Sequence, residues 1–180
     1  MEYTEKVLSE ETLFKGQIID LAVQQVALPN GQTASREIVY HHGAVGIIPI
    51  TADNRILLVR QWRAPMQRET LEIPAGKIDP GEKNLDQVAL RELNEETGLT
   101  TQKLVHVTDF FSSPGFSNEL MTLYYTDTLT PVTHKRSLDD DEFLNVEKLT
   151  LEEAQAAVAD GLICDAKTIM ALYYWQLQAK

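Results

Sequence analysis

Three glutamates, Glu92, Glu95 and Glu96, lie within five consecutive positions of the sequence. Clustered carboxylates repel one another, and turning them toward a protein interior adds a desolvation cost. Arg91 can pair with Glu95 four residues on, but one guanidinium cannot balance three carboxylates. Hard divalent cations need clustered oxygen ligands, and Mg²⁺ suits a few carboxylates together with substrate phosphates and water. The cluster therefore indicates a metal site, although a helix face exposed to solvent would carry the same residues with no such role.

A helix over residues 85–97 would position these carboxylates. Asn84 is placed to cap its first turn, in a capping-box pattern, and Gly98 is placed to end it in the left-handed conformation. At ~100° per residue, the apolar side chains of the first turns share an arc with Glu92 and Glu96, and the third glutamate lies at its edge. The stripe that should pack on a sheet therefore turns acidic partway along the helix.

The other predicted elements form a mixed sheet with helices packed on its faces, an α/β fold. Residues 17–40 predict a hairpin, because the central Pro-Asn-Gly suits the positive φ of a tight turn. Short apolar runs predict further strands, and the near-continuous hydrophobicity of the first three indicates burial on both faces. These strands cover residues 43–50, 55–62, 70–76, 104–111, 119–129 and 142–149. Two helices close the chain, one after a capping box at Thr150 and Glu153, the other after Asp165.

Composition limits the classes of function. With 180 residues, 43% of them hydrophobic, the chain is long enough for one main domain. The formal net charge of −11 argues against nucleic-acid binding, which relies on a basic surface that neutralises phosphates. No apolar run approaches the ~20 residues needed to cross a bilayer, and the charged N-terminus does not resemble a signal peptide. We therefore expect a cytoplasmic protein with no nucleic-acid or membrane partner, and an anionic substrate would need local cations.

The spacing of these residues resembles the signature of the Nudix hydrolases. The signature is a glycine and a glutamate followed by Arg-Glu-apolar-any-Glu-Glu-any-Gly-apolar, and nine positions match: Gly76, Glu82, Arg91, Glu92, Leu93, Glu95, Glu96, Gly98 and Leu99. Eight residues separate Glu82 from Arg91, one more than the family pattern usually has. If the additional residue, Lys83, lies in the loop before the helix, the helical ligands keep their geometry. If it lies inside the helix, Glu82 is displaced.

The resemblance implies a Nudix α/β/α sandwich that hydrolyses a nucleoside diphosphate linked to another group, with Mg²⁺ or Mn²⁺. Such chemistry suits a metal site, because the charge of a diphosphate repels nucleophiles until cations neutralise it. By resemblance, Glu92 and Glu96 bind the metal together with the backbone carbonyl of Ala75. Glu95 would be a further ligand, directly or through water, and Arg91 would orient the carboxylates. Glu82 would be a supporting acid.

Several weaker matches resemble the ADP-ribose diphosphatases of this family. Pro114, sixteen residues after Gly98, has the spacing that marks them, although a Pro-Gly turn is also an ordinary loop. Arg63 and Arg36 are candidate cations for the diphosphate, with surface salt bridges as the alternative. Glu119 resembles a position that contacts the substrate's ribose or terminal sugar, and its alternative is a solvated loop acid. The segments "RQWRAP", "LEIPAG" and "DGLICDAKTIMALYYWQLQ" also look like this subfamily.

A second acidic run, "LDDDEF", precedes the last predicted strand. ADP-ribose diphosphatases carry a mobile acidic loop at this place and draw a general base or metal ligand from it. The resemblance favours Glu142, with Asp141 as the alternative one residue earlier. A loop that closes over bound substrate would let these acids act from outside the rigid elements.

The hairpin at the start of the chain cannot bury both of its faces against its own chain. We therefore expect residues 1–42 to form a β-rich region exchanged with a second subunit of a homodimer, and residues 43–180 to form the Nudix hydrolase domain. The family points the same way, with the partner completing the substrate pocket.

The leading hypothesis is hydrolysis of ADP-ribose to AMP and ribose 5-phosphate. A second hypothesis keeps the chemistry and changes the substrate to a GDP-sugar or another nucleoside diphosphate conjugate. A third is a binding module that senses a nucleotide without cleaving it, which the intact acidic set argues against.

Overall fold

The computed structural model describes residues 2–138 and 142–178. The chain divides into two compact units. The first consists of Met1–Gly43 and Phe110–Met121, and the second consists of Ala44–Asp109 and Thr122–Lys180. The predicted exchange of residues 1–42 between subunits stays a prediction.

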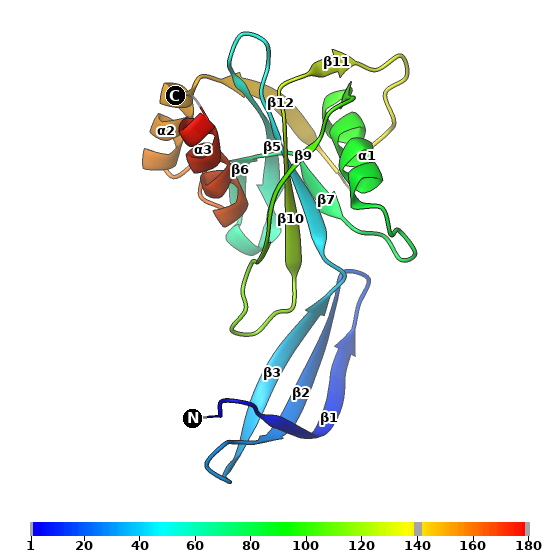
Figure 1. The fold of residues 1–180 in the computed structure, drawn as a ribbon, viewed down its shortest axis with the longest axis vertical. Helices are drawn as coiled ribbons and strands as arrows, with labels where there is room; N and C mark the ends of the chain where they lie inside the picture. The colour runs from blue at the N-terminus through cyan, green and yellow to red at the C-terminus, as the bar shows by residue number, and fades with distance from the viewer. Residues whose placement is uncertain (1, 139–141, 179–180) are drawn as a thin grey trace. The chain divides into compact units, whose positions relative to one another are not determined.

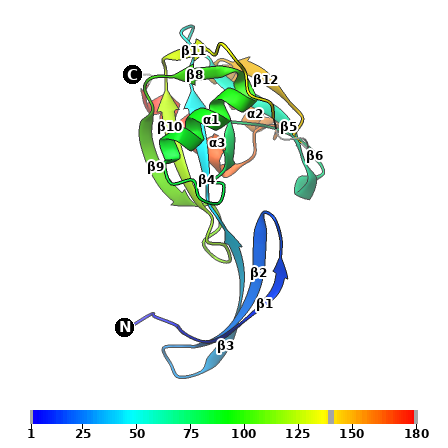
Figure 2. The ribbon, with the colours of Figure 1, turned by 90° about the vertical axis from the view of Figure 1, so that its right-hand side faces the viewer.

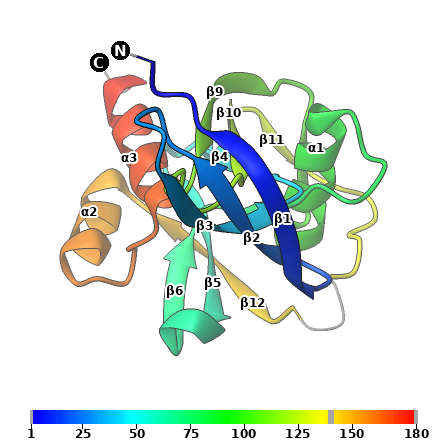
Figure 3. The same cartoon turned by 90° about the horizontal axis from the view of Figure 1, so that it is seen from below.

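The first unit is built on a three-stranded antiparallel sheet in the order β1-β2-β3 (Figure 1, Figure 3). The strands are β1 (Lys6–Lys15), β2 (Ile19–Ala27) and β3 (Thr33–His41). The predicted hairpin is confirmed as the β2–β3 pair, and Gly31 takes the expected positive φ of 84° in its turn. Sequence patterning missed β1, because two register shifts in its pairing with β2 break the alternation of its side chains.

The second unit contains short strands in three sheets. One has the order β7-β4-β10-β9, one the order β12-β5-β6, and β11 pairs with β8. The strands are β4 (Ala44–Pro49), β5 (Ile56–Arg63), β6 (Arg68–Glu72), β7 (Ala75–Lys77), β8 (Leu99–Thr101), β9 (Val105–Phe111), β10 (Leu120–Thr126), β11 (Leu129–Pro131) and β12 (Leu144–Leu149). A 3₁₀ turn, η1 (Ala64–Met66), joins β5 to β6. The near-continuous hydrophobic β4 is buried along its whole length, as predicted.

Helices cover both faces of these strands, which confirms the α/β/α sandwich with a mixed sheet (Figure 1, Figure 2). α1 (Leu85–Thr97) lies on one side, and α2 (Leu151–Ala159) and α3 (Ala166–Gln178) lie on the other. The core on the α1 side joins the apolar face of that helix to β4 and β10; its buried members are Val45, Ile47, Val88, Ala89, Leu93 and Tyr124. On the other side, α3 contacts β4 and buries Trp175. None of the helices in the described part of the chain is long and apolar enough to cross a membrane.

Both ends of α1 and the start of α2 lie where the sequence predicted them. α1 runs from Leu85 to Thr97, with Asn84 as its N-cap and Gly98 at φ 71° as its C-cap. α2 starts after Thr150, and the reciprocal capping box with Glu153 is present. These caps are local, so the sequence alone specifies them.

The predicted strand over residues 70–76 is instead two strands. Pro74 interrupts it, because proline has no N–H to donate to a ladder. Before the break, β6 pairs with β5; after it, β7 pairs with β4, so the chain changes sheets within a few residues. This change of sheet brings Ala75 and Gly76 beside α1, which contacts both β4 and β7.

Candidate metal and diphosphate site

The acidic end of α1 faces the protein interior. Glu92 is 6% exposed and Glu96 is 3% exposed, beside the buried Val88 and Leu93 of the same helix. Glu95 is half-buried at the edge of this face. The predicted arc is therefore confirmed, and the alternative of a solvent-exposed face is wrong for Glu92 and Glu96.

Strand β7 supplies the backbone that meets these carboxylates. The amide of Ala75 donates a hydrogen bond to Oε2 of Glu96 at 3.2 Å. In an extended strand the N–H and C=O of one residue point to the same side, so the Ala75 carbonyl also faces α1. Gly76 follows, and a Cβ built there would lie 1.9 Å from Cδ of Glu92. Only glycine therefore leaves room for the Glu92 carboxylate at this place.

Arg91 joins the acidic side chains to one another. Its Nη1 lies 2.7 Å from Oε1 of Glu92 and 3.0 Å from Oε2 of Glu95. On its other side, Nε and Nη2 donate to the two oxygens of Glu82 at 3.2 and 3.1 Å. Nη2 also donates to the carbonyl of Lys77 at 3.2 Å. These contacts hold the guanidinium in one orientation, and its role in orienting the carboxylates stays a prediction.

The loop before α1 decides between the two positions left open for the additional residue. α1 begins at Leu85, so Lys83 lies in the loop and the helical ligands keep their spacing. Glu82 reaches Arg91 from this loop, where the amide of Asp79 donates to its Oε2 at 2.9 Å. The structure places Glu82 as a partner of Arg91, and its hydrogen bonds with Arg91 lower the pKa of the Glu82 carboxyl.

Burial raises the pKa of both inner carboxylates, Glu92 and Glu96. Burial raises the pKa of Glu92 to about 7, and the charges of Glu95 and Glu142 add to the rise that Arg91 opposes. Burial and the charge of Glu92 raise the pKa of Glu96 well above its usual range. A divalent cation at this place would supply the missing charge. The donor set suits Mg²⁺ or Mn²⁺, because it is made only of oxygens, two carboxylates and the Ala75 carbonyl.

Within the described residues, no three side chains of His, Cys, Asp or Glu already converge as a set that could hold a metal ion. Arg91 forms ion pairs with the carboxylates of Glu92 and Glu95. Mg²⁺ is commonly held by one or two carboxylates, with substrate phosphates and water completing the shell. Glu92 and Glu96 would supply two such carboxylates, and the Ala75 carbonyl would supply a further oxygen.

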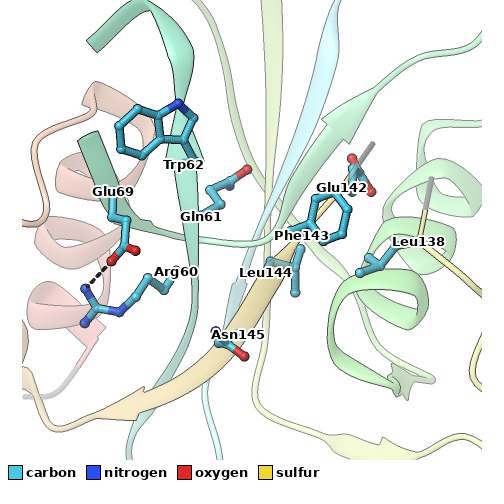
Figure 4. Close-up of a pocket in the computed structure, with 9 residues that line it drawn as sticks. All are labelled: Arg60, Gln61, Trp62, Glu69, Leu138, Glu142, Phe143, Leu144 and Asn145. Atoms are coloured by element: carbon cyan, nitrogen blue, oxygen red, sulfur yellow. Dashed lines mark ion pairs between the residues drawn. The ribbon is translucent and has the colours of Figure 1, made fainter. Parts of the chain in front are cut away.

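Glu142 is in the same unit and borders a pocket of about 480 Å³ (Figure 4). The pocket lies against the paired strands β5 and β12 and is lined by Arg60, Gln61, Trp62, Glu69, Leu138, Glu142, Phe143, Leu144 and Asn145. The charge of Glu142 contributes to the raised pKa of both Glu92 and Glu96, so it belongs to their electrostatic surroundings. Asp141, the alternative acid, lies outside the described residues.

Arg63, at the end of β5, is held by a buried acid. Its Nε and Nη2 donate to the two oxygens of Glu72 at 2.7 and 2.6 Å, and Glu72 is 2% exposed. Lys167 of α3 donates to the same carboxylate. Sequence reasoning missed Glu72 and Lys167; the available signal for Glu72 was an acid inside the apolar run "LEIP".

The other predicted substrate residues belong to the first unit, away from α1 in the sequence. Arg36 forms a two-pronged ion pair with Glu5, at 3.0 and 2.5 Å, so its predicted surface salt bridge is present. Pro114 is exposed in a turn closed by the Phe116 amide and the Ser113 carbonyl. Glu119 accepts a hydrogen bond from Ser112.

The fold and the acidic face of α1 agree with the family models that match this chain. A NUDIX domain matches residues 40–171, and a nucleoside diphosphate sugar hydrolase N-terminal domain matches residues 5–39. Because these matches cover most of the chain, it belongs to the Nudix hydrolase family.

Relatives and solved structures agree with this assignment. The chain is 45% identical to an ADP-ribose pyrophosphatase of Bacillus subtilis (strain 168), over 97% of this chain and 94% of that protein. It is 43% identical to a methanol dehydrogenase activator of Bacillus methanolicus, over 98% and 95% of the two chains. It is 32% identical to an ADP-ribose pyrophosphatase of Mycobacterium tuberculosis, over 93% and 81%. A crystal structure of an ADP compounds hydrolase has the same fold, with a TM-score of 0.81 at 24% identity, over 94% and 90%.

Proposed function

We propose that this protein hydrolyses the diphosphate of ADP-ribose, releasing AMP and ribose 5-phosphate. The observation that carries the proposal is the buried pair Glu92 and Glu96 opposite Ala75 and Gly76, in a chain whose relative at 45% identity is an ADP-ribose pyrophosphatase. Two carboxylates without matching positive charge are costly to keep unless they serve a bound cation. A diphosphate substrate supplies the remaining oxygens that such a cation needs.

In this proposal the residues of α1 and β7 hold the metal ion. Glu92, Glu96 and the Ala75 carbonyl hold Mg²⁺ or Mn²⁺, and Glu95 holds it directly or through water. Arg91 keeps the carboxylates in place through the contacts described above. When bound, the metal neutralises phosphoryl oxygens and lowers the pKa of a bound water.

Substrate contacts are proposed for four further residues. Arg63 and Arg36 offer guanidinium groups for the diphosphate. Pro114 shapes the loop that marks the subfamily, and Glu119 contacts the ribose or the terminal sugar of the substrate. The role of Arg63 has the most direct support. Glu72 raises the pKa of Arg63 most, and the charge of Glu96, a proposed metal ligand, also contributes.

A proton acceptor for the attacking water is proposed in the acidic loop. Glu142 is the candidate among the described residues, since its charge acts on both Glu92 and Glu96. Asp141 stays the alternative. A Glu142→Gln variant that keeps full activity would assign the role to Asp141.

We propose a homodimer in the cytoplasm as the working form. Strand β1 is exposed along its whole length, and it carries large apolar side chains at Val7, Leu8, Leu13 and Phe14 that are 50–55% exposed. An exposed apolar edge strand favours a protein partner. Sedimentation velocity at micromolar concentration should show a dimer, and a monomer would contradict this proposal.

A Glu96→Gln variant tests the site. It should lose at least ~10³-fold in turnover of ADP-ribose with Mg²⁺, because a metal carboxylate is replaced by a neutral amide. Glu152→Gln is the matched control, since Glu152 is an exposed acid on α2, and it should keep wild-type activity. Wild-type turnover in Glu96→Gln would contradict the metal site.

A substrate panel separates the proposal from its alternatives. ADP-ribose should be cleaved faster than GDP-sugars and other nucleoside diphosphate conjugates. Preferential cleavage of a GDP-sugar would keep the chemistry and change the substrate. Tight binding of ADP-ribose in calorimetry, with no product after long incubation with Mg²⁺, would indicate a nucleotide-binding module.

A further inference from the structure

Glu72 lies at the centre of a buried network in which two elements contribute cations. It is the last residue of β6, three positions before Ala75. Its Oε1 accepts from Nε of Arg63 at 2.7 Å and from Oγ1 of Thr70 at 2.6 Å. Its Oε2 accepts from Nη2 of Arg63 at 2.6 Å and from Nζ of Lys167. The carboxylate therefore has four donors and no room for another partner.

These donors keep Glu72 ionised despite its burial. Burial alone would raise its pKa, but the hydrogen bonds from Arg63 and the charge of Lys167 lower the pKa of the Glu72 carboxyl to about 2. The carboxylate is therefore a fixed negative charge at neutral pH. A two-pronged contact to a fixed carboxylate leaves an arginine little freedom to rotate.

The contact with Glu72 uses one edge of the Arg63 guanidinium and leaves the other available. Nε and Nη2 bind Glu72, and among the described residues no hydrogen bond of Nη1 is present. The Arg63 side chain is 40% exposed, so Nη1 can reach solvent or a ligand. The Glu72 contact thus fixes the direction in which the free edge points.

Lys167 holds the opposite side of the carboxylate. Its side chain is 12% exposed, and its Nζ donates both to Glu72 and to Oδ2 of Asp165 at 3.0 Å. Asp165 in turn accepts from the amide of Thr168 at 3.1 Å, in the first turn of α3. Thr168 Oγ1 accepts from the amide of Ile73, next to Glu72, at 3.0 Å. α3 therefore anchors Glu72 at both its side chain and its neighbouring backbone.

We propose that Glu72 and Lys167 are positioning residues: they orient Arg63 so that its free edge binds a phosphoryl group of the substrate, and neither contacts the substrate. This inference rests on the proposed function. The charge of Glu96 contributes to the raised pKa of Arg63, which places the guanidinium within electrostatic range of that carboxylate. A purely structural link between β6 and α3 is the alternative, and it predicts a loss of stability without a change in substrate affinity of the folded protein.

Two measurements on the full-length protein test the proposal. The dissociation constant for ADP-ribose is measured by calorimetry in EDTA, where no turnover occurs, and KM and kcat are measured with Mg²⁺. In Glu72→Gln, the dissociation constant and KM should rise about tenfold or more, because the charged two-pronged contact that orients Arg63 is lost. The value of kcat should change less than about threefold. Lys167→Met should shift both constants in the same direction by a smaller factor, and Lys148→Met, an exposed lysine on β12, is its control.

A double-mutant cycle separates positioning from structure. Because Glu72 acts through Arg63, adding Glu72→Gln to Arg63→Ala should change the dissociation constant by less than about twofold. An undiminished effect of Glu72→Gln in the Arg63→Ala background would overturn the proposal. If Glu72→Gln does not fold, the variant Thr70→Val takes its place in the same cycle, because it removes one hydrogen-bond donor to Glu72.

The outcomes also distinguish this inference from the proposed function. Wild-type protein that binds and cleaves ADP-ribose, with a Glu72→Gln variant of unchanged affinity, would overturn the positioning role alone. Wild-type protein that neither binds nor cleaves ADP-ribose would overturn the proposed function and the inference with it.

Discussion

Replacing Glu92 by glutamine should stabilise the metal-free protein while removing its activity. Glu92 is 6% exposed, and burial raises the pKa of its carboxyl to about 7 from the ordinary value of 4.5. Below pH 4.5 the carboxyl is neutral in both the folded and unfolded states. Between pH 4.5 and 7 the folded state holds a proton that the unfolded state has released, so the free energy of unfolding falls as the pH rises through this window.

The size of the effect follows from that shift. A rise of about 2.5 pKa units corresponds to about 3 kcal/mol of lost stability at pH 8, at 1.36 kcal/mol per unit. Glutamine has the shape of the neutral acid and carries no charge, so Glu92→Gln should regain about 3 kcal/mol at pH 8. For a chain of this size that is about 6–12 °C in melting temperature.

Thermal unfolding in EDTA at pH 4 and pH 8 measures this difference. At pH 4 the melting temperatures of wild-type protein and Glu92→Gln should agree within about 2 °C, and at pH 8 the variant should melt higher. Adding Mg²⁺ at pH 8 should raise the melting temperature of the wild type and have little effect on the variant. A variant that is less stable than the wild type at pH 8 in EDTA would refute the electrostatic account.

Three further predictions follow from the surroundings of the carboxylates. Gly76→Ala should lower kcat/KM at least ~100-fold, because its Cβ would displace the Glu92 carboxylate. Gly115→Ala should keep the wild-type melting temperature, because a Cβ built at Gly115 meets nothing within 4 Å beyond its chain neighbours. Glu82→Gln should lower kcat about tenfold, less than loss of a metal ligand, since Arg91 keeps its other contacts; an unchanged kcat would contradict this role. Glu72, whose carboxyl pKa is lowered to about 2, stabilises the fold above pH 4.5 and loses that contribution as the pH falls toward 2. In urea titrations at decreasing pH, Glu72→Gln should therefore lose less stability than the wild type does.

Local signals made α1 and the burial of its carboxylates predictable. The caps at Asn84 and Gly98 bound the helix, and the 100° step per residue placed Glu92 and Glu96 on the buried arc. The turn residues Pro-Asn-Gly likewise predicted the β2–β3 hairpin. In each case the information lies within a few residues of the feature that it specifies.

Features that depend on distant contacts could not be predicted in this way. β1 was missed because its bulges hide the alternation, and the break at Pro74 depends on which sheet each half of the segment joins. The Glu72–Lys167 pair joins residues 95 positions apart, on elements whose packing no local pattern specifies. The role of Glu82 likewise needed the fold, since only the structure shows its carboxylate bound to Arg91.

Product analysis after incubation of the wild-type protein with ADP-ribose and Mg²⁺ tests the central claim most directly. The account predicts AMP and ribose 5-phosphate in equal amounts, with no product in EDTA and none from Glu96→Gln. ADP and free ribose as the products, or unreacted ADP-ribose under conditions in which a GDP-sugar is cleaved, would contradict it.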